Sequence, residues 1–522
     1  MKGSMKIGGA IVGLGLAALV AAPLARHHLG IAEAQTHPER GIDPKIVQPL
    51  AIGMNLGGPS YFTSEEVFAD PIKTRGTLFW ETDPRGPLGD QLKLDDGGRP
   101  IDVPAGTRLS ARIHDGLAPL ITGTYRCTIA PGWRIEEAVG GQVSQSGTKF
   151  TVTVPAKGLT DKTVLVVMSA EKNGAALTEL SCRYPGDRGN AIFRQDFLDD
   201  MKPFRVIRFM DWMATNNAPL RTWAQRTTPS SIEQIRHGMS VEYMVALANQ
   251  LHSDPWFTLP LDVDQGYYRN FATYVRDHLD PGLKAYVELS NEVWNDTFQQ
   301  AKDATQRGKK LYPGVSDDKA NDYYYGDRVR ELMSIWSDVF TGQRQRIVRV
   351  LGSMGWDLRT DQRLGHKETW KYVDAVAIAP YWGDVPNDVP STGKARVEAV
   401  IAKTPGYIDQ ALAAGHASKV MAAKYGLPLI TYEGGPGYWA YDQAMVKDME
   451  EVSNDPRVYA YYQIFLRRWQ KEIGGTLVLY QATAPTLFGH RQYTGQPLSE
   501  APKMRAVLDF INQLPTAAPP RP

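Results

Sequence analysis

The chain has little that would point to metal or redox chemistry. Its 522 residues include two cysteines and ten histidines. Neither the H-E-x-x-H pattern nor a Cys/His spacing typical of zinc sites occurs. We therefore expect no metal centre and no cofactor.

The chain also lacks an excess of charge of one sign. There are 58 basic and 57 acidic residues, for a formal net charge of +1. Binding to nucleic acid generally requires a strongly basic face. The balance of charge therefore argues against a nucleic-acid partner.

Long hydrophobic runs are absent after the N-terminus. The single run, Ile7–Ala25, follows two lysines and precedes an A-x-A site at Ala32 and Ala34. This arrangement is typical of a secretory signal peptide, here residues 1–34, and predicts an exported protein, periplasmic or secreted. The alternative is an uncleaved N-terminal anchor, since the run is nearly long enough to span a membrane.

The two cysteines, Cys127 and Cys182, both lie in strand-like contexts. In an exported protein such a pair is expected to form a disulfide, worth roughly 4 kcal/mol for a loop of this length in the chain-entropy model. Two buried free thiols are the alternative.

A chain of this length suits one barrel of roughly 250–350 residues plus a second unit. Between about Arg75 and Pro185, short β-rich runs such as TYRCTI and FTVTVP alternate with Gly, Pro and Asp turns. The spacing resembles that of a β-sandwich. We predict a β-rich, sandwich-like domain over residues 63–189 and a disordered Pro-rich tail over 515–522.

From about Ala191, short apolar strands alternate with helical patterns, which indicates repeated βα units. Eight candidate strands can be counted, at residues 49–58, 205–209, 256–260, 285–290, 347–352, 375–380, 428–433 and 476–481. They predict a (β/α)8 TIM barrel over 45–62 and 190–514, with the β-rich domain inserted after the first strand. The alternative assigns 49–58 to the β-rich domain and leaves the barrel incomplete.

Two acids occupy corresponding positions at the ends of two of these strands. Glu292 follows the fourth strand and Glu433 ends the seventh. In a TIM barrel these strand ends lie roughly across the mouth from each other, where the chemistry takes place. Two carboxylates that face each other across a cleft are what glycoside hydrolysis requires. Taken alone, Glu292 is better explained as an acid at a helix N-terminus, and its pairing with Glu433 and Asn291 favours catalysis.

The motifs IRFMDWMATNN, EYMVALANQLHSDPWF, YVELSNEVWN, VDAVAIAPYW and YEGG together resemble the clan A glycoside hydrolases, which are retaining (β/α)8 enzymes. They are also similar to a bacterial family of exported proteins that are often labelled cellulose-binding. The resemblance covers residues 203–510. It implies that Glu292 is the acid/base, that Glu433 is the nucleophile and that Asn291 binds the sugar 2-hydroxyl. It also implies that Arg208 and Tyr381 hold the nucleophile.

These neighbours also bear on the two pKa values. Arg208 and Tyr381 are expected to favour the charged form of Glu433, and Trp294 is expected to raise the pKa of Glu292.

Further candidates for sugar contact lie on loops after the strands. They are Asp211, Trp212 and Asn216 after the second strand, and Trp294, Trp382, Tyr438 and Trp439 elsewhere on the same face. An aromatic residue in such a place is either a sugar platform or a packing residue. Two features depart from the clan. The eighth strand ends in VLYQATAP without the usual tryptophan, and the third lacks a terminal histidine.

The sequence therefore predicts a retaining β-glycoside hydrolase that acts on a β-linked polysaccharide or oligosaccharide outside the cytoplasm. A non-catalytic carbohydrate-binding protein with the same barrel is the alternative.

Overall fold

The structure is a computed structural model. It describes residues 45, 47–60, 63–75, 78–80, 92–95, 99–114, 118–157, 162–187, 189–232, 234, 237–354, 359–384, 392–440, 442–485 and 487–514. The predicted signal peptide and the Pro-rich tail lie outside these residues. Within the part that is described, no helix is both long and apolar enough to cross a membrane.

Eight parallel strands close into a barrel, which confirms the predicted TIM barrel. In order around the barrel they are β1 (Gln48–Asn55), β10 (Val206–Arg208), β11 (Asp254–Leu259), β12 (Ala285–Leu289), β13 (Ile347–Gly352), β14 (Ala375–Ile378), β16 (Leu429–Thr431) and β18 (Gly474–Leu479). The segment 49–58 thus contributes the first barrel strand and does not belong to the β-rich domain.

The strands are apolar because both of their faces are covered. Val206, Trp256 and Val478 belong to a small cluster inside the barrel. Their neighbours Ile207 and Phe257 belong instead to the large cluster between strands and helices. Successive residues of a strand point to opposite faces, so a strand in this position is hydrophobic on both.

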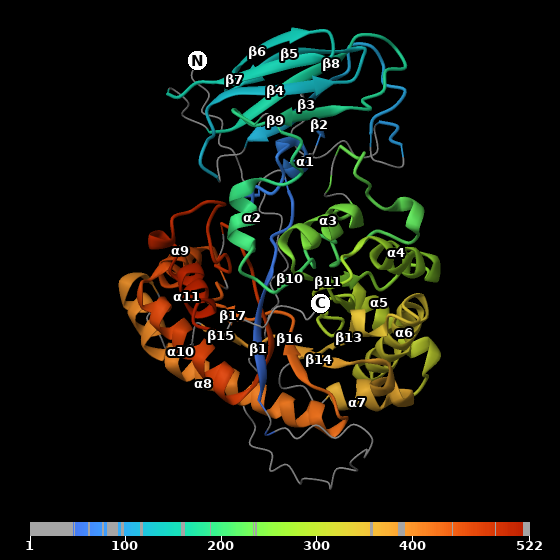
Figure 1. Cartoon of the computed structure of the whole chain (residues 1–522), viewed down its shortest axis with the longest axis vertical. Helices are drawn as coiled ribbons and strands as arrows, with labels where there is room; N and C mark the ends of the chain where they lie inside the picture. Colours follow the sequence, from blue (N-terminus) through green and yellow to red (C-terminus); the bar gives the residue numbers. More distant parts are fainter. Residues whose placement is uncertain are drawn as a thin grey trace.

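Helices surround the barrel, as Figure 1 shows. Those that follow the strands are α3 (Val241–Leu251), α4 (Gln265–His278), α5 (Gln299–Leu311), α6 (Asp317–Val339), α7 (Arg359–Gly365), α8 (Gly393–Lys424), α9 (Gln443–Asn454), α10 (Arg457–Glu472) and α11 (Pro502–Ile511). A short pair of strands, β15 (Tyr381–Trp382) and β17 (Gly435–Pro436), extends the barrel wall beyond β14 and β16.

The second unit consists of two four-stranded antiparallel sheets, drawn in blue to cyan in Figure 1. One sheet has the order β2 (Leu78–Trp80), β3 (Arg108–His114), β8 (Val164–Ala170) and β5 (Trp133–Val139). The other has the order β6 (Gln142–Ser146), β7 (Lys149–Val154), β4 (Gly123–Ile129) and β9 (Leu180–Arg183). The two sheets share a separate hydrophobic core.

In this unit Cys127 on β4 lies opposite Cys182 on β9, and the two sulfur atoms form a disulfide with an S–S distance of 2.06 Å. The bridge therefore joins neighbouring strands of one sheet.

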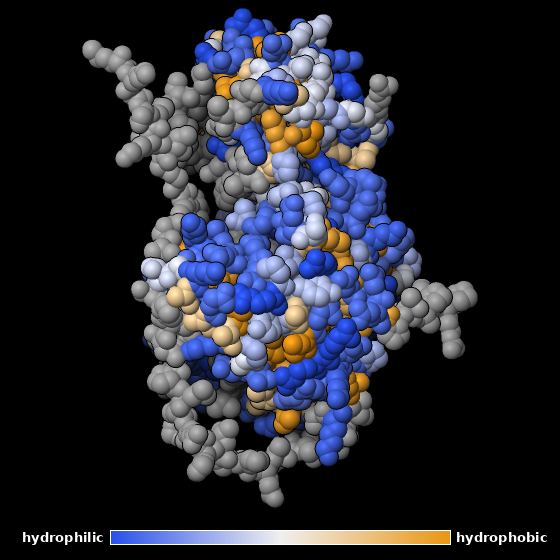
Figure 2. Space-filling model, turned by 90° about the vertical axis from the view of Figure 1, so that its left-hand side faces the viewer, coloured by the Kyte–Doolittle hydropathy of each residue, from blue (hydrophilic) through white to orange (hydrophobic). Residues whose placement is uncertain are grey.

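On the face shown in Figure 2, hydrophobic residues of both units form small patches between hydrophilic ones.

The β-rich unit is inserted between β1 and β10 and lies at the end of the barrel to which the parallel strands point. The chain leaves the barrel at the C-terminal end of β1 and returns through α2 (Gln195–Met201). Near the crossing, the amide of Glu66 donates to Thr494 Oγ1 at 2.8 Å, and Tyr184 donates to the Glu66 carboxylate at 2.5 Å. Ile232, which belongs to the barrel, is buried in the core of the inserted unit.

Candidate active site

Glu433 lies two residues beyond the end of β16, and its carboxylate is buried. Arg208 Nη1 donates to Oε1 at 2.9 Å, and the Tyr381 hydroxyl donates to Oε2 at 2.9 Å. Tyr381 reaches this position because it pairs with Gly435 in the β15–β17 ladder. Gly435 has φ +108°, and a Cβ there would lie 2.7 Å from the Tyr462 hydroxyl, so the position requires glycine.

Arg208, the last residue of β10, uses every N–H group of its guanidinium. An arginine has five such donors. Nε and one Nη2 proton go to Glu288 Oε2, at 3.1 and 3.0 Å. The remaining protons go to Glu433, to Asn55 Oδ1 at 3.1 Å and to Asn291 Oδ1 at 3.0 Å. Arg208 therefore connects four side chains of the barrel interior and has no donor left for a ligand.

Glu292 follows β12 in a left-handed backbone conformation with φ +42°. Its Oε1 accepts a hydrogen bond from the Tyr432 hydroxyl at 3.1 Å, and its Oε2 accepts one from Asn295 Nδ2 at 2.9 Å. A positive φ is uncommon for a residue with a side chain and costs of order 1 kcal/mol. The conformation turns the chain out of the strand at the point where the carboxyl group must face the barrel mouth.

Asn291 is held in place from two sides. Its Oδ1 accepts from Arg208, and its Nδ2 donates to Asn216 Oδ1 at 3.2 Å. Asn216 in turn accepts from Gln300 Nε2 at 2.8 Å. One proton of the Asn291 amide group remains for another acceptor, since the group has two.

The two acids affect each other's titration. Burial is the largest cause and raises the pKa of both, that of Glu433 to about 8. Arg208 and Tyr381 lower the pKa of Glu433, while the charge of Glu292 raises it. Arg208 and Tyr381 therefore act on the pKa of Glu433 in the predicted direction, but burial outweighs their effect.

Since the charge of Glu292 raises the pKa of Glu433, the two carboxyl groups titrate as an interacting pair. The guanidinium and the phenol contact Glu433 directly, whereas Glu292 has an amide and a phenol as donors. When one of the two groups is ionised, its negative charge is therefore better stabilised on Glu433.

Asp211 lies three residues after β10, on the loop that follows the strand of Arg208. Its Oδ2 accepts from the Tyr480 hydroxyl at 3.1 Å and from Gln481 Nε2 at 3.0 Å. Burial raises the pKa of Asp211 to about 6, against the lowering effect of Tyr480, Arg208 and Gln481. The charge of Asp211 contributes to the raised pKa of Glu433.

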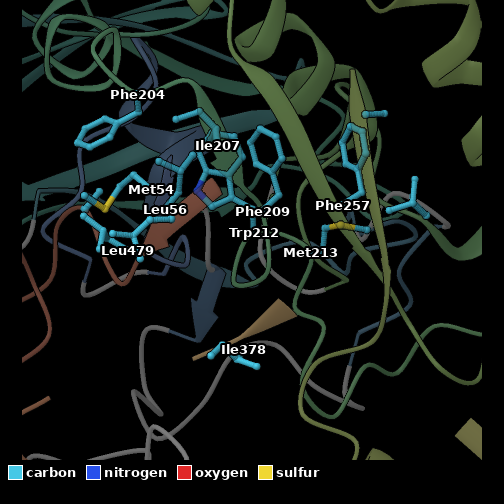
Figure 3. Close-up of a cluster of buried hydrophobic side chains, with 14 of the residues drawn as sticks. Met54, Leu56, Phe204, Ile207, Phe209, Trp212, Met213, Phe257, Ile378 and Leu479 are labelled. Carbon is cyan, nitrogen blue, oxygen red and sulfur yellow. The ribbon is translucent and has the colours of Figure 1, made fainter. Parts of the chain in front are cut away.

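The candidate aromatic residues fall into two groups. Three are buried among other hydrophobic side chains and present no face to the barrel mouth. Trp212 packs between Phe68, Phe197 and Phe209, as Figure 3 shows in part. Trp382 packs on Tyr438, Tyr462 and Phe465, and Tyr438 donates to or accepts from Thr404. The structure thus places Trp212, Trp382 and Tyr438 in the core, as packing residues.

The other two lie closer to the acids. Trp294 is partly buried, with its ring 6.2 Å from that of Tyr432 and with Arg363 over its face at 5.1 Å. Trp439 is 9% exposed and packs edge-on against Tyr381 and Phe488.

The sequence reasoning missed four residues of this network: Asn55, Trp256, Glu288 and Tyr432. Of these four residues, Glu288 is the one whose place inside the barrel follows from the sequence pattern of its strand. In β12, Tyr286 and Glu288 alternate with Ala285, Val287 and Leu289. The strand period of two places Glu288 inside the barrel. A charged residue inside a strand that is buried on both faces needs a partner, and Arg208 is that partner.

Among the described residues, no group of three or more His, Cys, Asp or Glu side chains is arranged to hold a metal ion.

No known protein family matches the chain by sequence, and no curated protein matches it. Solved structures do match. A GH51 arabinofuranosidase from Xanthomonas axonopodis pv. citri is 15% identical over 57% of this chain, with a TM-score of 0.36. This chain spans 62% of the arabinofuranosidase's length.

Two further structures are similar at the same level. A Bacteroidetes-affiliated GH5 cellulase is 12% identical, with coverage of 64% of this chain and 88% of the cellulase and a TM-score of 0.32. A β-glucosidase from Thermotoga maritima in complex with deoxynojirimycin is 11% identical, with coverage of 62% and 86% and a TM-score of 0.35. The likeness is distant and concerns the fold.

Proposed function

We propose that the protein is a retaining β-glycoside hydrolase that acts on a polysaccharide or oligosaccharide outside the cytoplasm. One observation carries the proposal. Two carboxyl groups, the buried Glu433 and the partly buried Glu292, lie at the same end of the barrel, the charge of Glu292 acts on Glu433, and the two have different hydrogen-bond donors. Unequal surroundings of two acids are what allow one to act as an acid and the other as a nucleophile.

In the first step, the Glu433 carboxylate attacks the anomeric carbon of the sugar. The bond from that carbon to the leaving oxygen breaks as Glu292 donates its proton to this oxygen. The products are an ester between Glu433 and the sugar and the free aglycone. Arg208 and Tyr381 hold the attacking carboxylate through one oxygen each.

In the second step, Glu292 is ionised and removes a proton from water. The water oxygen attacks the anomeric carbon, the ester bond breaks, and Glu433 leaves as a carboxylate. The Tyr432 and Asn295 donors to Glu292 stabilise its ionised form between the steps. Two inversions at the anomeric carbon give net retention of configuration.

The remaining proton of the Asn291 amide group suits the role of donor to the sugar 2-hydroxyl. The amide is fixed on both sides by Arg208 and Asn216. Such preorganisation allows a hydrogen bond that strengthens in the transition state without loss of further side-chain entropy.

A mechanism-based inhibitor tests the proposal. A panel of 2-deoxy-2-fluoro β-glycosides with an activated leaving group should esterify one carboxylate, and peptide mass spectrometry should find the label on Glu433. The Glu433→Gln variant is the control and should remain unlabelled. A label on another residue would overturn the assignment of the nucleophile.

The carboxylate on the opposite side is tested separately. Glu292→Ala should lose most activity on substrates with poor leaving groups, and added azide should restore turnover with a β-glycosyl azide as product. Retention also requires the two carboxyl groups to be roughly 5–5.5 Å apart. A crystal structure of a complex with a separation of roughly 8 Å would exclude the retaining mechanism. Tight sugar binding with neither labelling nor turnover would identify a carbohydrate-binding protein.

A further inference from the structure

Asp211 presents one free carboxylate oxygen next to the candidate nucleophile. Its Oδ2 is held by Tyr480 and Gln481. Among the described residues, none donates a hydrogen bond to Oδ1, and Oδ1 is not one of the fully buried unpartnered atoms. The carboxylate is therefore fixed through one oxygen and open to a ligand through the other.

A chain of contacting side chains joins Asp211 to Glu433. Tyr480 donates to Asp211 and packs on Phe488, and Phe488 packs on Tyr381, which donates to Glu433. The charges of Asp211 and Glu433 both act on the Tyr480 hydroxyl, and Asp211 acts on Glu433 itself. Gly58 lies beside Asp211, and a Cβ at Gly58 would lie 3.4 Å from that of Asp211. The chain after β1 thus passes close to the base of the Asp211 side chain.

The aromatic rings in this chain of contacts are partly exposed. The rings of Tyr381 and Phe488 have centroids 5.9 Å apart, and those of Tyr480 and Phe488 are 5.7 Å apart. Behind them the Trp439 ring packs against Phe488 at 4.9 Å. An apolar ring face together with a fixed hydrogen-bond acceptor is a combination that suits a sugar, which has C–H faces and hydroxyl edges.

The charge around these rings is predominantly negative. It comes from Glu292, Glu433 and Asp211, and the basic group that acts on all three is Arg208. All five donors of Arg208 are already used within the protein. Among the described residues, Arg208 thus offers no N–H group to a carboxylate or sulfate on the bound sugar. Such a group would meet like charge from the three acids, which costs affinity.

We propose that Asp211 and the Tyr381–Phe488–Tyr480 wall form the recognition site for the sugar ring on the nucleophile's side, and that this site selects uncharged, hydroxyl-bearing sugars over uronates. Asp211 accepts one or two sugar hydroxyls through Oδ1, and the aromatic wall packs against the ring. The inference rests on the proposed function for its location next to the cleaved bond.

The test uses matched pairs of probes: β-linked gluco-, manno- and galacto-oligosaccharides and their C6-oxidised, uronate-containing counterparts. For the wild type we expect kcat/KM on a cleaved neutral probe to exceed that on its oxidised partner by at least about 10-fold. Asp211→Asn should reduce kcat/KM on the neutral probe by roughly 10- to 100-fold, because it removes a charged acceptor. In the same variant, the ratio of kcat/KM on the neutral probe to kcat/KM on its oxidised partner should be smaller than in the wild type.

Asp262→Asn is the matched control. Asp262 also follows a barrel strand, but its carboxylate pairs with Arg307, and its variant should behave like the wild type on all probes. Tyr480→Phe removes one donor to Asp211 and retains the charge of Asp211. It should therefore reduce kcat/KM on the neutral probes less than Asp211→Asn does. A wild type that cleaves the oxidised probes as well as the neutral ones, or an unaltered Asp211→Asn variant, overturns the inference.

Failure of the proposed function gives a different pattern. In that case Glu433 is not labelled by the fluoro-glycosides, while calorimetric titration of the wild type still reports whether neutral probes bind more tightly than oxidised ones. An Asp211→Asn protein that keeps its melting temperature and is still labelled at Glu433 has lost recognition and not its fold. The absence of binding by every neutral probe overturns the inference as well.

Discussion

Glu288 Oε2 and the guanidinium of Arg208 form a buried pair, with Nη2 at 3.0 Å and Nε at 3.1 Å. The same oxygen accepts from Trp256 Nε1 at 2.8 Å. Arg208 thus contacts two carboxylates. Its Nε and Nη2 donate to Glu288, and its Nη1 donates to the candidate nucleophile Glu433. The position of Glu288 indicates that it orients Arg208 and shares its positive charge.

Replacement of Glu288 by Gln tests this positioning role. Without the charge of Glu288, Arg208 acts more strongly on Glu433, so the pKa of Glu433 should fall and the acid limb of the kcat/KM profile should move to lower pH. Activity should also fall, by up to about 100-fold, because Arg208 is less firmly oriented. Unfolding in urea should show a loss of several kcal/mol, roughly 3–5, since one partner of a buried ion pair is removed.

Trp256→Phe is the comparison for this variant, because it removes a donor to Glu288 and leaves all charges in place. Its pH profile should keep the position of the wild-type acid limb. If Glu288→Gln lowers stability but leaves the acid limb where it was, Glu288 has a structural role alone.

Removal of the disulfide should affect the inserted unit first. Cys127 and Cys182 are 55 residues apart and join β4 to β9. The double variant Cys127→Ala/Cys182→Ala should lower the free energy of unfolding of this unit by roughly 4 kcal/mol at most. Differential scanning calorimetry with and without reductant should show the same downward shift for the reduced wild type. An unchanged transition would mean that the bridge does not constrain the unfolded chain.

Lys503 provides a pH-dependent contribution to stability. It is buried on α11, where Nζ donates to Ser453 Oγ at 2.6 Å and to the Leu487 carbonyl at 2.7 Å. Burial lowers its pKa to about 7. The unfolded chain holds this proton up to about pH 10.4. Between these values the unfolded state binds more protons, so stability rises with pH, and the cost of the buried charge is full below about pH 7.

Lys503→Met should remove this slope. The variant should therefore be more stable than the wild type at pH 7, and this advantage in free energy of unfolding should become smaller as the pH rises to 10. Urea titrations at several pH values measure the difference. Lys309→Met, at a half-exposed position on α5, is the control and should parallel the wild type. Parallel curves for Lys503→Met would show that the lysine binds its proton equally in the folded and unfolded states, so that burial does not lower its pKa.

The sequence predicted the barrel because parallel strands buried on both faces appear as short apolar runs at regular intervals. It predicted the approximate location of Glu292 and Glu433 because all strand ends meet at one face. It did not identify β5 and β6 as strands, since WRIEEAV and QVSQS carry polar residues on their exposed side. Alternation, and not hydrophobicity, marks such strands.

The aromatic candidates show what sequence position alone leaves open. Tyr381 and Trp382 are neighbours on β15, and a strand points them to opposite sides. Tyr381 reaches Glu433, while Trp382 packs against Phe465 on α10. Which of two adjacent residues faces the barrel mouth is decided by the β15–β17 register. That register results from tertiary pairing across 54 residues (435 − 381) and leaves no local pattern in the sequence.

Two hydroxyl groups next to the acids should move different limbs of the pH profile. The Tyr381 hydroxyl donates to Glu433 and lowers its pKa. Tyr381→Phe should therefore raise the pKa of Glu433. Since the nucleophile must be ionised, the acid limb of kcat/KM should move to higher pH. The Tyr432 hydroxyl donates to Glu292 and lowers its pKa. Tyr432→Phe should raise the pKa of Glu292, and since this acid must be protonated, the alkaline limb should move to higher pH.

The pair of variants thus separates the two roles with one measurement, kcat/KM against pH on a substrate found by the labelling panel. Each loss of a hydrogen bond to a charged group should also reduce kcat/KM at the optimum by roughly 10- to 100-fold. Tyr268→Phe, which removes a buried hydroxyl that donates to the Pro260 carbonyl, is the control and should leave both limbs in place. If Tyr381→Phe shifts the alkaline limb and Tyr432→Phe the acid limb, the roles of Glu292 and Glu433 are reversed, because each phenol contacts only one of the two carboxyl groups in the described structure.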